Sequence, residues 1–131
     1  MIPASNQKLL VATAALDILG PDHVFTTSVA APTAIDGEID GDIYLIGGGD
    51  PLLTSGDFPR DDPRLSVASA TPFEVLADAL VDAGITRIRG TVIGDGSRYD
   101  DEFTNPDWIE GVAFNDAGPI DALMVNDALV L

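Results

Sequence analysis

The sequence predicts a domain of the α+β class. An unbroken apolar run at residues 9–19 and a segment at 73–83 with a helix start signal favour helices. Segments rich in β-branched residues at 23–30, 40–46 and 88–93 favour strands. This strand–helix–strand order is compatible with α+β and with α/β domains, and it leaves the order of strands in the sheet open.

The first helix is expected to be buried. Residues 9–19 are apolar on nearly every side, and a helix that is hydrophobic all round belongs in a core. Gly20 and Pro21 then end the helix. Because Met1 stands directly before this helix, nothing upstream could cover it, so we expect a truncated N-terminus.

The first two strands are expected to pair as a hairpin that turns at Asp36-Gly37. A long polar loop follows at 52–70. The segment 71–74 (Thr-Pro-Phe-Glu) predicts a capping box with proline at the first helical position. The expected core positions of this second helix are Phe73, Leu76, Leu80 and Ala83.

The third strand is expected to end in a turn at 94–97, and the residues that follow it are expected to be irregular. Residues 98–119 show no regular period, and we expect Trp108 and Phe114 to anchor them to the core. A last short strand is expected at 122–125. The length of 131 residues is enough for one core.

The start of the first helix has the residues for acyl transfer. Ser5 and Lys8 are three positions apart, so on a helix they share one face, with Cβ atoms about 5–6 Å apart. Burial would lower the pKa of the lysine ammonium and let it take the serine proton. Free N–H groups of the first helical turn could stabilise an oxyanion.

A simpler interpretation of the same spacing is structural. Ser5 could cap the helix while Lys8 extends its ammonium to solvent from the first turn. The Ser-x-x-Lys spacing alone does not separate these two interpretations.

Composition excludes several classes of function. The chain has 22 acidic and 6 basic residues, a formal net charge of −16, which opposes binding to nucleic acid or to anionic lipid. It has no cysteine, so thiolate chemistry and disulfides are excluded. No apolar stretch approaches the roughly 18 residues of a membrane span, and no signal peptide is visible.

Three further patterns favour structure over binding. Residues 36–47 resemble half of a calcium loop, but Gly47 stands where a bidentate glutamate is required, so a hairpin turn is favoured. The glycines at 47–49 lack the following helix of a phosphate loop. His23 is the single histidine, so histidine triads and zinc sites with several His or Cys ligands are not expected.

Several segments in order along the chain resemble one enzyme family. They are residues 1–10 around Ser5 and Lys8, 19–22, 25–27, 41–51, 84–85, 90–95 and 118–127. Together they resemble D-alanyl-D-alanine carboxypeptidase/endopeptidases of the DacB type, the class C low-molecular-mass penicillin-binding proteins. The resemblance covers nearly the whole chain.

The resemblance implies a serine-bearing helix of a β-lactamase/transpeptidase-like catalytic domain, followed by its inserted mixed α/β domain. On this basis residues 1–24 begin the catalytic domain, 25–120 are the insert, and 121–131 form a strand leading back toward the catalytic domain. Ser5 matches the family's nucleophile and Lys8 its general base. Asp95, with Tyr99 nearby, matches the position that binds the amino end of the diaminopimelate side chain.

The resemblance also implies a substrate, inhibitors and a location. The substrates are peptidoglycan stem peptides and the inhibitors are β-lactams. The protein is expected in the periplasm or cell envelope, with no metal or organic cofactor.

The family's Ser-x-Asn and Lys-Thr-Gly motifs are absent here, because no lysine follows Lys8 and no Ser-x-Asn occurs after the insert. We therefore expect an inactive fragment of a longer enzyme. The alternatives are a non-catalytic cell-envelope binding module of the same ancestry and, more distantly, an unrelated calcium-stabilised domain.

Overall fold

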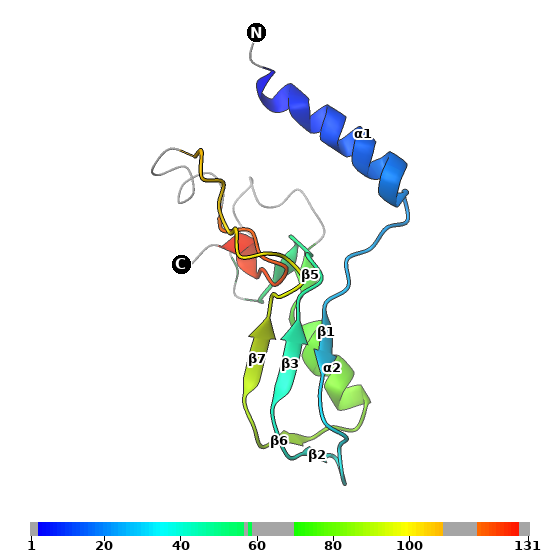
Figure 1. Ribbon diagram of the computed structural model, residues 1–131. Helices are drawn as coiled ribbons and strands as arrows, with labels where there is room; N and C mark the ends of the chain where they lie inside the picture. The colour runs from blue at the N-terminus through cyan, green and yellow to red at the C-terminus, as the bar shows by residue number, and fades with distance from the viewer. Residues whose placement is uncertain (1–2, 57, 59–69, 109–117, 129–131) are drawn as a thin grey trace.

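The computed structural model describes residues 3–56, 58, 70–108 and 118–128. Its helices and strands form a mixed α+β fold, which agrees with the predicted class (Figure 1). The described elements are η1 (Ala4–Asn6), α1 (Gln7–Leu19), β1 (Ser28–Ala30), β2 (Glu38–Ile39), β3 (Ile43–Ile46), β4 (Leu53–Thr54), β5 (Thr71–Pro72), α2 (Glu74–Asp82), β6 (Arg87–Ile88), β7 (Val92–Asp95) and η2 (Asn126–Ala128).

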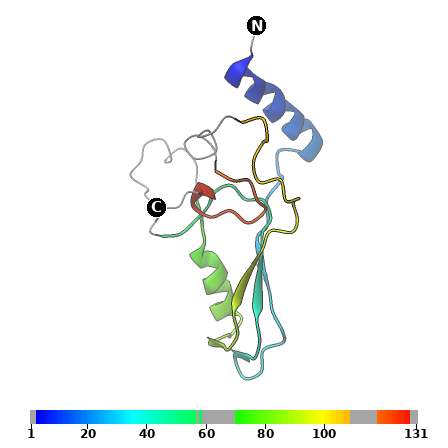
Figure 2. The ribbon, with the colours of Figure 1, turned by 60° about the vertical axis from the view of Figure 1, so that its left-hand side comes forward.

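The centre of the fold is a three-stranded sheet in the order β1-β3-β7. Strand β3 pairs antiparallel with β1 and parallel with β7. Ile43 and Leu45 on β3 are buried, whereas Tyr44 between them is 44% exposed. Figures 1 and 2 show α2 against one face of this sheet, while the other face has no helix over it. The alternation therefore gives one core face and one open face.

The hairpin turn lies where it was predicted. Asp36 and Gly37 have φ values of 51° and 78°, and Ile35 and Glu38 exchange two backbone hydrogen bonds of 2.8 and 2.9 Å across them. Positive φ at both central residues is the requirement of a type I′ hairpin turn, which Asp-Gly meets at low cost. This confirms the turn at Asp36-Gly37, which the sequence favoured over a calcium loop.

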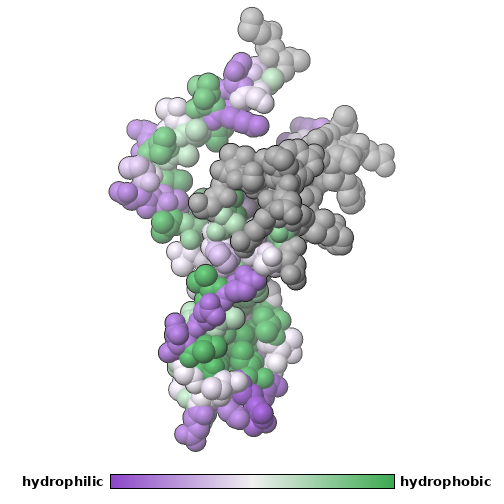
Figure 3. Space-filling model, turned by 180° about the vertical axis from the view of Figure 1, so that it is seen from behind, coloured by the Kyte–Doolittle hydropathy of each residue, from purple (hydrophilic) through white to green (hydrophobic). Residues whose placement is uncertain are grey.

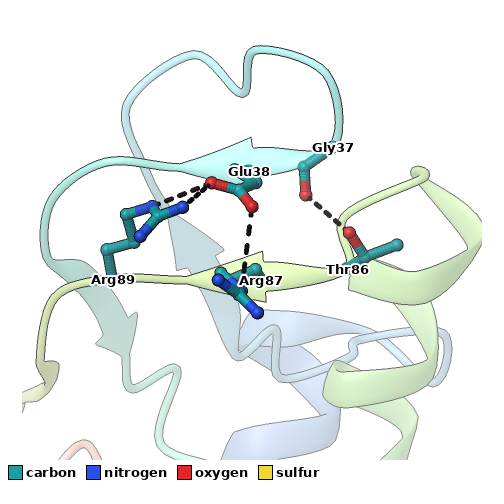
Figure 4. Close-up of polar contacts among 5 residues, drawn as sticks. All are labelled: Gly37, Glu38, Thr86, Arg87 and Arg89. Atoms are coloured by element: carbon teal, nitrogen blue, oxygen red, sulfur yellow. Dashed lines mark hydrogen bonds and ion pairs between the residues drawn. The ribbon is translucent and has the colours of Figure 1, made fainter.

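A small parallel pair, β2 with β6, closes the end of the molecule beyond this turn. Glu38 on β2 accepts hydrogen bonds from Nε (2.8 Å) and an Nη of Arg89, and Arg87 Nε lies 3.7 Å from the other carboxylate oxygen (Figure 4). The Thr86 hydroxyl donates to the Gly37 carbonyl at 3.2 Å. These contacts hold the segment after α2, including β6, against the hairpin.

The predicted capping box of the second helix is wrong. Thr71 and Pro72 form β5, which pairs in parallel with β4, and Phe73 takes the N-cap position without a side-chain hydrogen bond. Glu74 accepts the Gly56 N–H at 2.7 Å. Pairing with a strand about 18 residues away in the sequence therefore replaces the local capping pattern.

The expected apolar side of α2 is largely confirmed. Phe73, Leu76 and Leu80 are half-buried, as positions that face the sheet should be. Ala83, the fourth expected core position, is exposed at the C-cap of the helix.

The strands are shorter than their sequence patterns. The segment 23–30 is a strand only from Ser28, the second strand is confined to 43–46 after the separate pair at 38–39, and 88–93 divides into β6 and β7. The division falls at Gly90, where an added Cβ would lie 2.3 Å from the Gly41 carbonyl.

Residues 122–125 form no strand, because they bend toward η2. The expected turn begins two residues later than predicted, since Gly94 and Asp95 belong to β7.

The long loop at 52–70 contains one described strand, β4. Trp108 is half-buried, consistent with its expected anchoring role, and Phe114 lies outside the described residues. In the described part of the chain no helix is long and apolar enough to cross a membrane.

The expected burial of the first helix is wrong for this chain. Every residue of α1 is exposed, with Leu10 at 71% and Ile18 at 77%. Figure 1 shows α1 standing apart from the sheet at the end of a linker. The physical reason is the absence, among the described elements, of a surface that packs against it: its substantial contact is with η1, which precedes it.

Candidate active site

Ser5 and Lys8 lie at the junction of η1 and α1. Ser5 is in the 3-10 turn, and Lys8 is the second residue of the α-helix. The residues between them, Asn6 and Gln7, have helical dihedral angles (φ −62° and −61°), so the two positions stay on one face as predicted. Ala4, directly before the serine, has φ +47°, a region that costs a non-glycine residue free energy.

Both side chains are open to solvent. Ser5 and Lys8 are exposed, and neither makes a hydrogen bond or ion pair with another described residue. Ser5 does not cap the helix, since the N-cap of α1 is Asn6 and that of η1 is Pro3. The structural interpretation of Ser5 as the cap is therefore wrong. The burial that the lysine-base hypothesis requires is also missing in this chain.

Asp95 is the last residue of β7, where it pairs with Ile46 of β3. Its carboxylate Oδ1 accepts the Ser97 N–H at 2.9 Å. Hydrogen bonds from the Ser97 hydroxyl and N–H lower the pKa of the Asp95 carboxyl, because they stabilise its charged form. This aspartate is therefore a stable anion on the surface, and no cation among the described residues pairs with it.

Tyr99 lies one turn beyond Asp95. Its N–H donates to the Gly96 carbonyl at 3.2 Å, and its side chain is 41% exposed. The hydroxyl lies against Gly49, where an added Cβ would be 2.2 Å from the oxygen. The structure thus places Asp95 at the end of β7 and Tyr99 in the loop that follows, where the tyrosine hydroxyl contacts the glycine segment after β3.

A second aspartate at this loop was not predicted from the sequence. Asp121 lies against Gly96: a Cβ added to this glycine would be 2.0 Å from the Oδ1 atom of Asp121. The same oxygen accepts the Leu123 N–H at 3.4 Å. Asp121 and Gly96 are 25 positions apart, so no local pattern could have found this contact.

The two halves of the predicted site are not in contact. Ser5 and Lys8 belong to the separate α1 segment, whereas Asp95 and Tyr99 belong to the sheet end. Between them runs the linker 20–27, in which His23 is exposed and stacks edge-on against Phe25 at a centroid distance of 5.1 Å. Among the described residues no group of three or more acids, histidines or cysteines could hold a metal ion.

The glycines at 47–49 are packed rather than open for a phosphate. All three are buried, and the N–H groups of Gly47 and Gly49 donate to the carbonyls of Asp95 (2.9 Å) and Ala122 (2.8 Å). Two of the three N–H groups are thus already used within the fold, which disfavours a phosphate loop here, in agreement with the lack of a following helix.

Comparison with known proteins places this arrangement in a family. The family model described as D-Ala-D-Ala carboxypeptidase 3 (S13) matches residues 1–131. The chain belongs to this S13 family. The resemblance found in the sequence is thereby confirmed, and both the serine-bearing helix and the sheet end lie within the matched range.

A curated relative and a solved structure agree with this assignment. The chain is 36% identical over 110 residues to a D-alanyl-D-alanine carboxypeptidase of Actinomadura sp. (strain R39), which covers 82% of this chain. It is similar to penicillin binding protein 4 (dacB) from Haemophilus influenzae, with a TM-score of 0.71, 27% identity and 97% of this chain covered.

The S13 chain described here spans a small part of these proteins. The matched region is 18% of the Actinomadura enzyme and 25% of the Haemophilus protein. The similarity therefore assigns the family and the α+β fold, in a transpeptidase-like protein, to this stretch of sequence.

Proposed function

We propose that this chain supplies the nucleophile segment of a serine-type D-Ala-D-Ala carboxypeptidase or endopeptidase that acts on peptidoglycan stem peptides. Ser5 Oγ attacks the carbonyl carbon of the D-Ala-D-Ala bond while Lys8 Nζ accepts its proton. The bond to the terminal D-Ala nitrogen then breaks, that nitrogen takes a proton, and the acyl group stays on Ser5. Water hydrolyses the ester and regenerates the serine. No metal or organic cofactor enters these steps.

One observation carries the proposal. The S13 family model matches residues 1–131, and within that match Ser5 and Lys8 lie on one face at the start of α1. The family assignment favours the catalytic interpretation of the Ser-x-x-Lys spacing, which the spacing alone does not separate from the structural one.

The exposure of Lys8 limits what the chain can do by itself. Withdrawing an ammonium from water favours its neutral, basic form, and Lys8 is exposed here. We therefore expect the 131-residue chain alone to have negligible peptidase activity. In this proposal residues 1–24 belong to the catalytic domain, 25–120 to its insert, and 121–131 lead back toward the catalytic domain.

Asp95 and Tyr99 are proposed to bind the substrate. The Asp95 carboxylate has no cationic partner among the described residues and suits the side-chain ammonium of a diamino acid in the stem peptide. The Tyr99 hydroxyl lies in the same loop. Such a substrate places the protein in the cell envelope, and β-lactams are the expected inhibitors.

The test is intact-mass labelling with benzylpenicillin. The isolated chain and a longer protein that contains it are each incubated with the drug beside a Ser5→Ala control. We expect a covalent adduct on the longer protein that disappears with Ser5→Ala, and no adduct on the isolated chain. A folded longer protein that stays unlabelled would contradict the proposal.

The alternative is a non-catalytic cell-envelope binding module of the same ancestry. The exposed, unpartnered Ser5 and Lys8 side chains favour it. It predicts no penicillin adduct in either protein, together with retained binding of stem peptides.

A further inference from the structure

The exposed side of α2 carries acidic residues at intervals of about one helical turn. Glu74, Asp78 and Asp82 are four positions apart, so their side chains follow one another along the same side of the helix, and all three residues are exposed. Like charges at this spacing destabilise a helix. Glu74 is compensated, because it lies at the start of the helix, where the helix dipole favours an anion, and accepts the Gly56 N–H at 2.7 Å.

The C-terminal half of α2 has no such compensation. Asp82 is the last residue of the helix, and the last turn contains no basic residue. The free carbonyl groups at a helix C-terminus carry partial negative charge, so an anion there is destabilising. The ion pairs within the described part of the chain end on Glu38, and neither Asp78 nor Asp82 has a partner among the described residues (Figure 4).

The apolar packing that opposes this repulsion is partial. No residue of α2 is buried: Leu76 and Leu80 are half-buried, whereas Val75 and Val81 are 54% and 66% exposed. A helix of nine residues is too short to be stable without tertiary contacts. The repulsion at the C-terminal half of α2 is therefore set against a small packing contribution, and a change in either one shifts the population of the packed helix.

We propose that α2 is an ionic-strength-dependent element, whose C-terminal half packs fully on the sheet only when dissolved ions screen the charges of Asp78 and Asp82. The screening length falls from about 30 Å at 0.01 M salt to about 3 Å at 1 M, which is shorter than the roughly 5–6 Å between neighbours on a helix. At low ionic strength this half of the helix frays from its C-terminus, and Leu80 becomes accessible to water. The net charge of −16 acts in the same direction, because self-repulsion of the whole chain also weakens as salt is added.

The test is amide hydrogen exchange of the 131-residue chain at one pH, in NaCl at about 0.01 M and about 1 M. We expect the amides of residues 78–82 to gain about tenfold in protection relative to those of β3, since the like-charge and helix-dipole contributions together amount to about one decade in an equilibrium constant. Asp78→Asn/Asp82→Asn should show the higher protection already at the lower salt concentration and lose most of the salt response. Tetramethylammonium chloride should act as NaCl does, because screening depends on ionic strength and not on the identity of the cation.

The matched control is Asp22→Asn/Asp107→Asn, which removes the same amount of charge from exposed residues outside α2. This variant should keep the salt response of residues 78–82. Protection of α2 that does not change with salt would overturn the proposal, and so would an equal loss of the response in the control variant. A loss of protection in β3 together with α2 at low salt would show that the whole fold responds rather than this helix. A response to sodium but not to tetramethylammonium would show a bound cation instead of screening.

Discussion

At residues 47–49 the backbone is contacted from three sides. An added Cβ would lie 2.3 Å from Ala122 at Gly47, 2.1 Å from the Thr26 carbonyl oxygen at Gly48, and 2.2 Å from the Tyr99 hydroxyl at Gly49. The glycine segment is therefore the point at which the linker from α1, the Asp95–Tyr99 loop and the chain after 118 meet. Three glycines stand there because the close contacts leave no room for a side chain, and not because the segment binds a ligand.

This packing gives a stability prediction for Gly48→Ala. The new methyl group would overlap backbone atoms of Thr26, which cannot move as a side chain could, so we expect a loss of about 3 kcal/mol in the free energy of unfolding. Gly94→Ala is the matched control, because its nearest obstacle is the flexible end of Leu123 at 3.1 Å; its expected cost is below about 1 kcal/mol. Urea unfolding of both variants measures the difference, and equal midpoints would contradict the close approach at Gly48.

Asp95 gives a prediction about pH. Hydrogen bonds from Ser97 hold the pKa of this carboxyl below its ordinary value of 3.8. Because the folded-state pKa is depressed, the stabilising contribution of these bonds is complete above pH 3.8 and is lost as the pH falls through the lower, folded-state value. We expect the carboxyl ¹³C resonance of Asp95 to titrate below pH 3.8, and Ser97→Ala to raise the pKa toward that value while the backbone N–H bond remains. An unchanged pKa in Ser97→Ala would show that the hydroxyl has no role.

At the scale of elements, the two helices differ in how their apolar residues are arranged. In α2 and at its N-cap the half-buried apolar side chains, Phe73, Leu76 and Leu80, lie on one side of the helix, whereas Val75 and Val81 are exposed. In α1 the apolar side chains surround the helix, so a single contacting surface could not cover them all, and here they are exposed. An isolated helix of 13 residues is marginally stable in water, because tertiary packing supplies most helical stability in proteins.

This contrast predicts the hydrogen exchange of the isolated chain. We expect the amides of α1 to exchange with less than about tenfold protection, while those of β3, which has strands on both sides, are protected to the level of global unfolding. Exchange measured by mass spectrometry or NMR separates the two elements. Protection of α1 equal to that of β3 would mean that the helix is covered in solution, for example by a second copy of the chain.

Sequence patterns gave the type of most elements correctly and their ends less well. The 36–37 turn and the apolar stripe of α2 follow from local chemistry, so residues nearby in the sequence suffice to predict them. The start of α2 does not follow from local chemistry, because the residues before it form β5, which pairs with β4 across a loop. Strand β6 was merged with β7 because the apolar pattern continues across Gly90, where a contact with Gly41 interrupts the pairing.

At the scale of the whole molecule, the described chain has a sheet with α2 on one face and a separate helix that carries Ser5 and Lys8 (Figure 1). Seen from the α2 side, hydrophobic surface lies beside hydrophilic surface over the lower part of the molecule (Figure 3). The matched region is 18% of the full length of one relative and 25% of that of the other. A covering surface for α1 is thus expected in the remainder of such a protein.

Neighbouring residues, or motifs kept in order along the chain, are enough to predict the α+β class, the hairpin turn, the S13 family and the Ser-x-x-Lys spacing. Three features follow from the folded arrangement instead: α1 is exposed, Asp121 lies against Gly96, and Tyr44 shares a sheet face with Asp95. Burial, strand register and backbone contacts depend on residues tens of positions apart, and their free energies are set only when those residues meet.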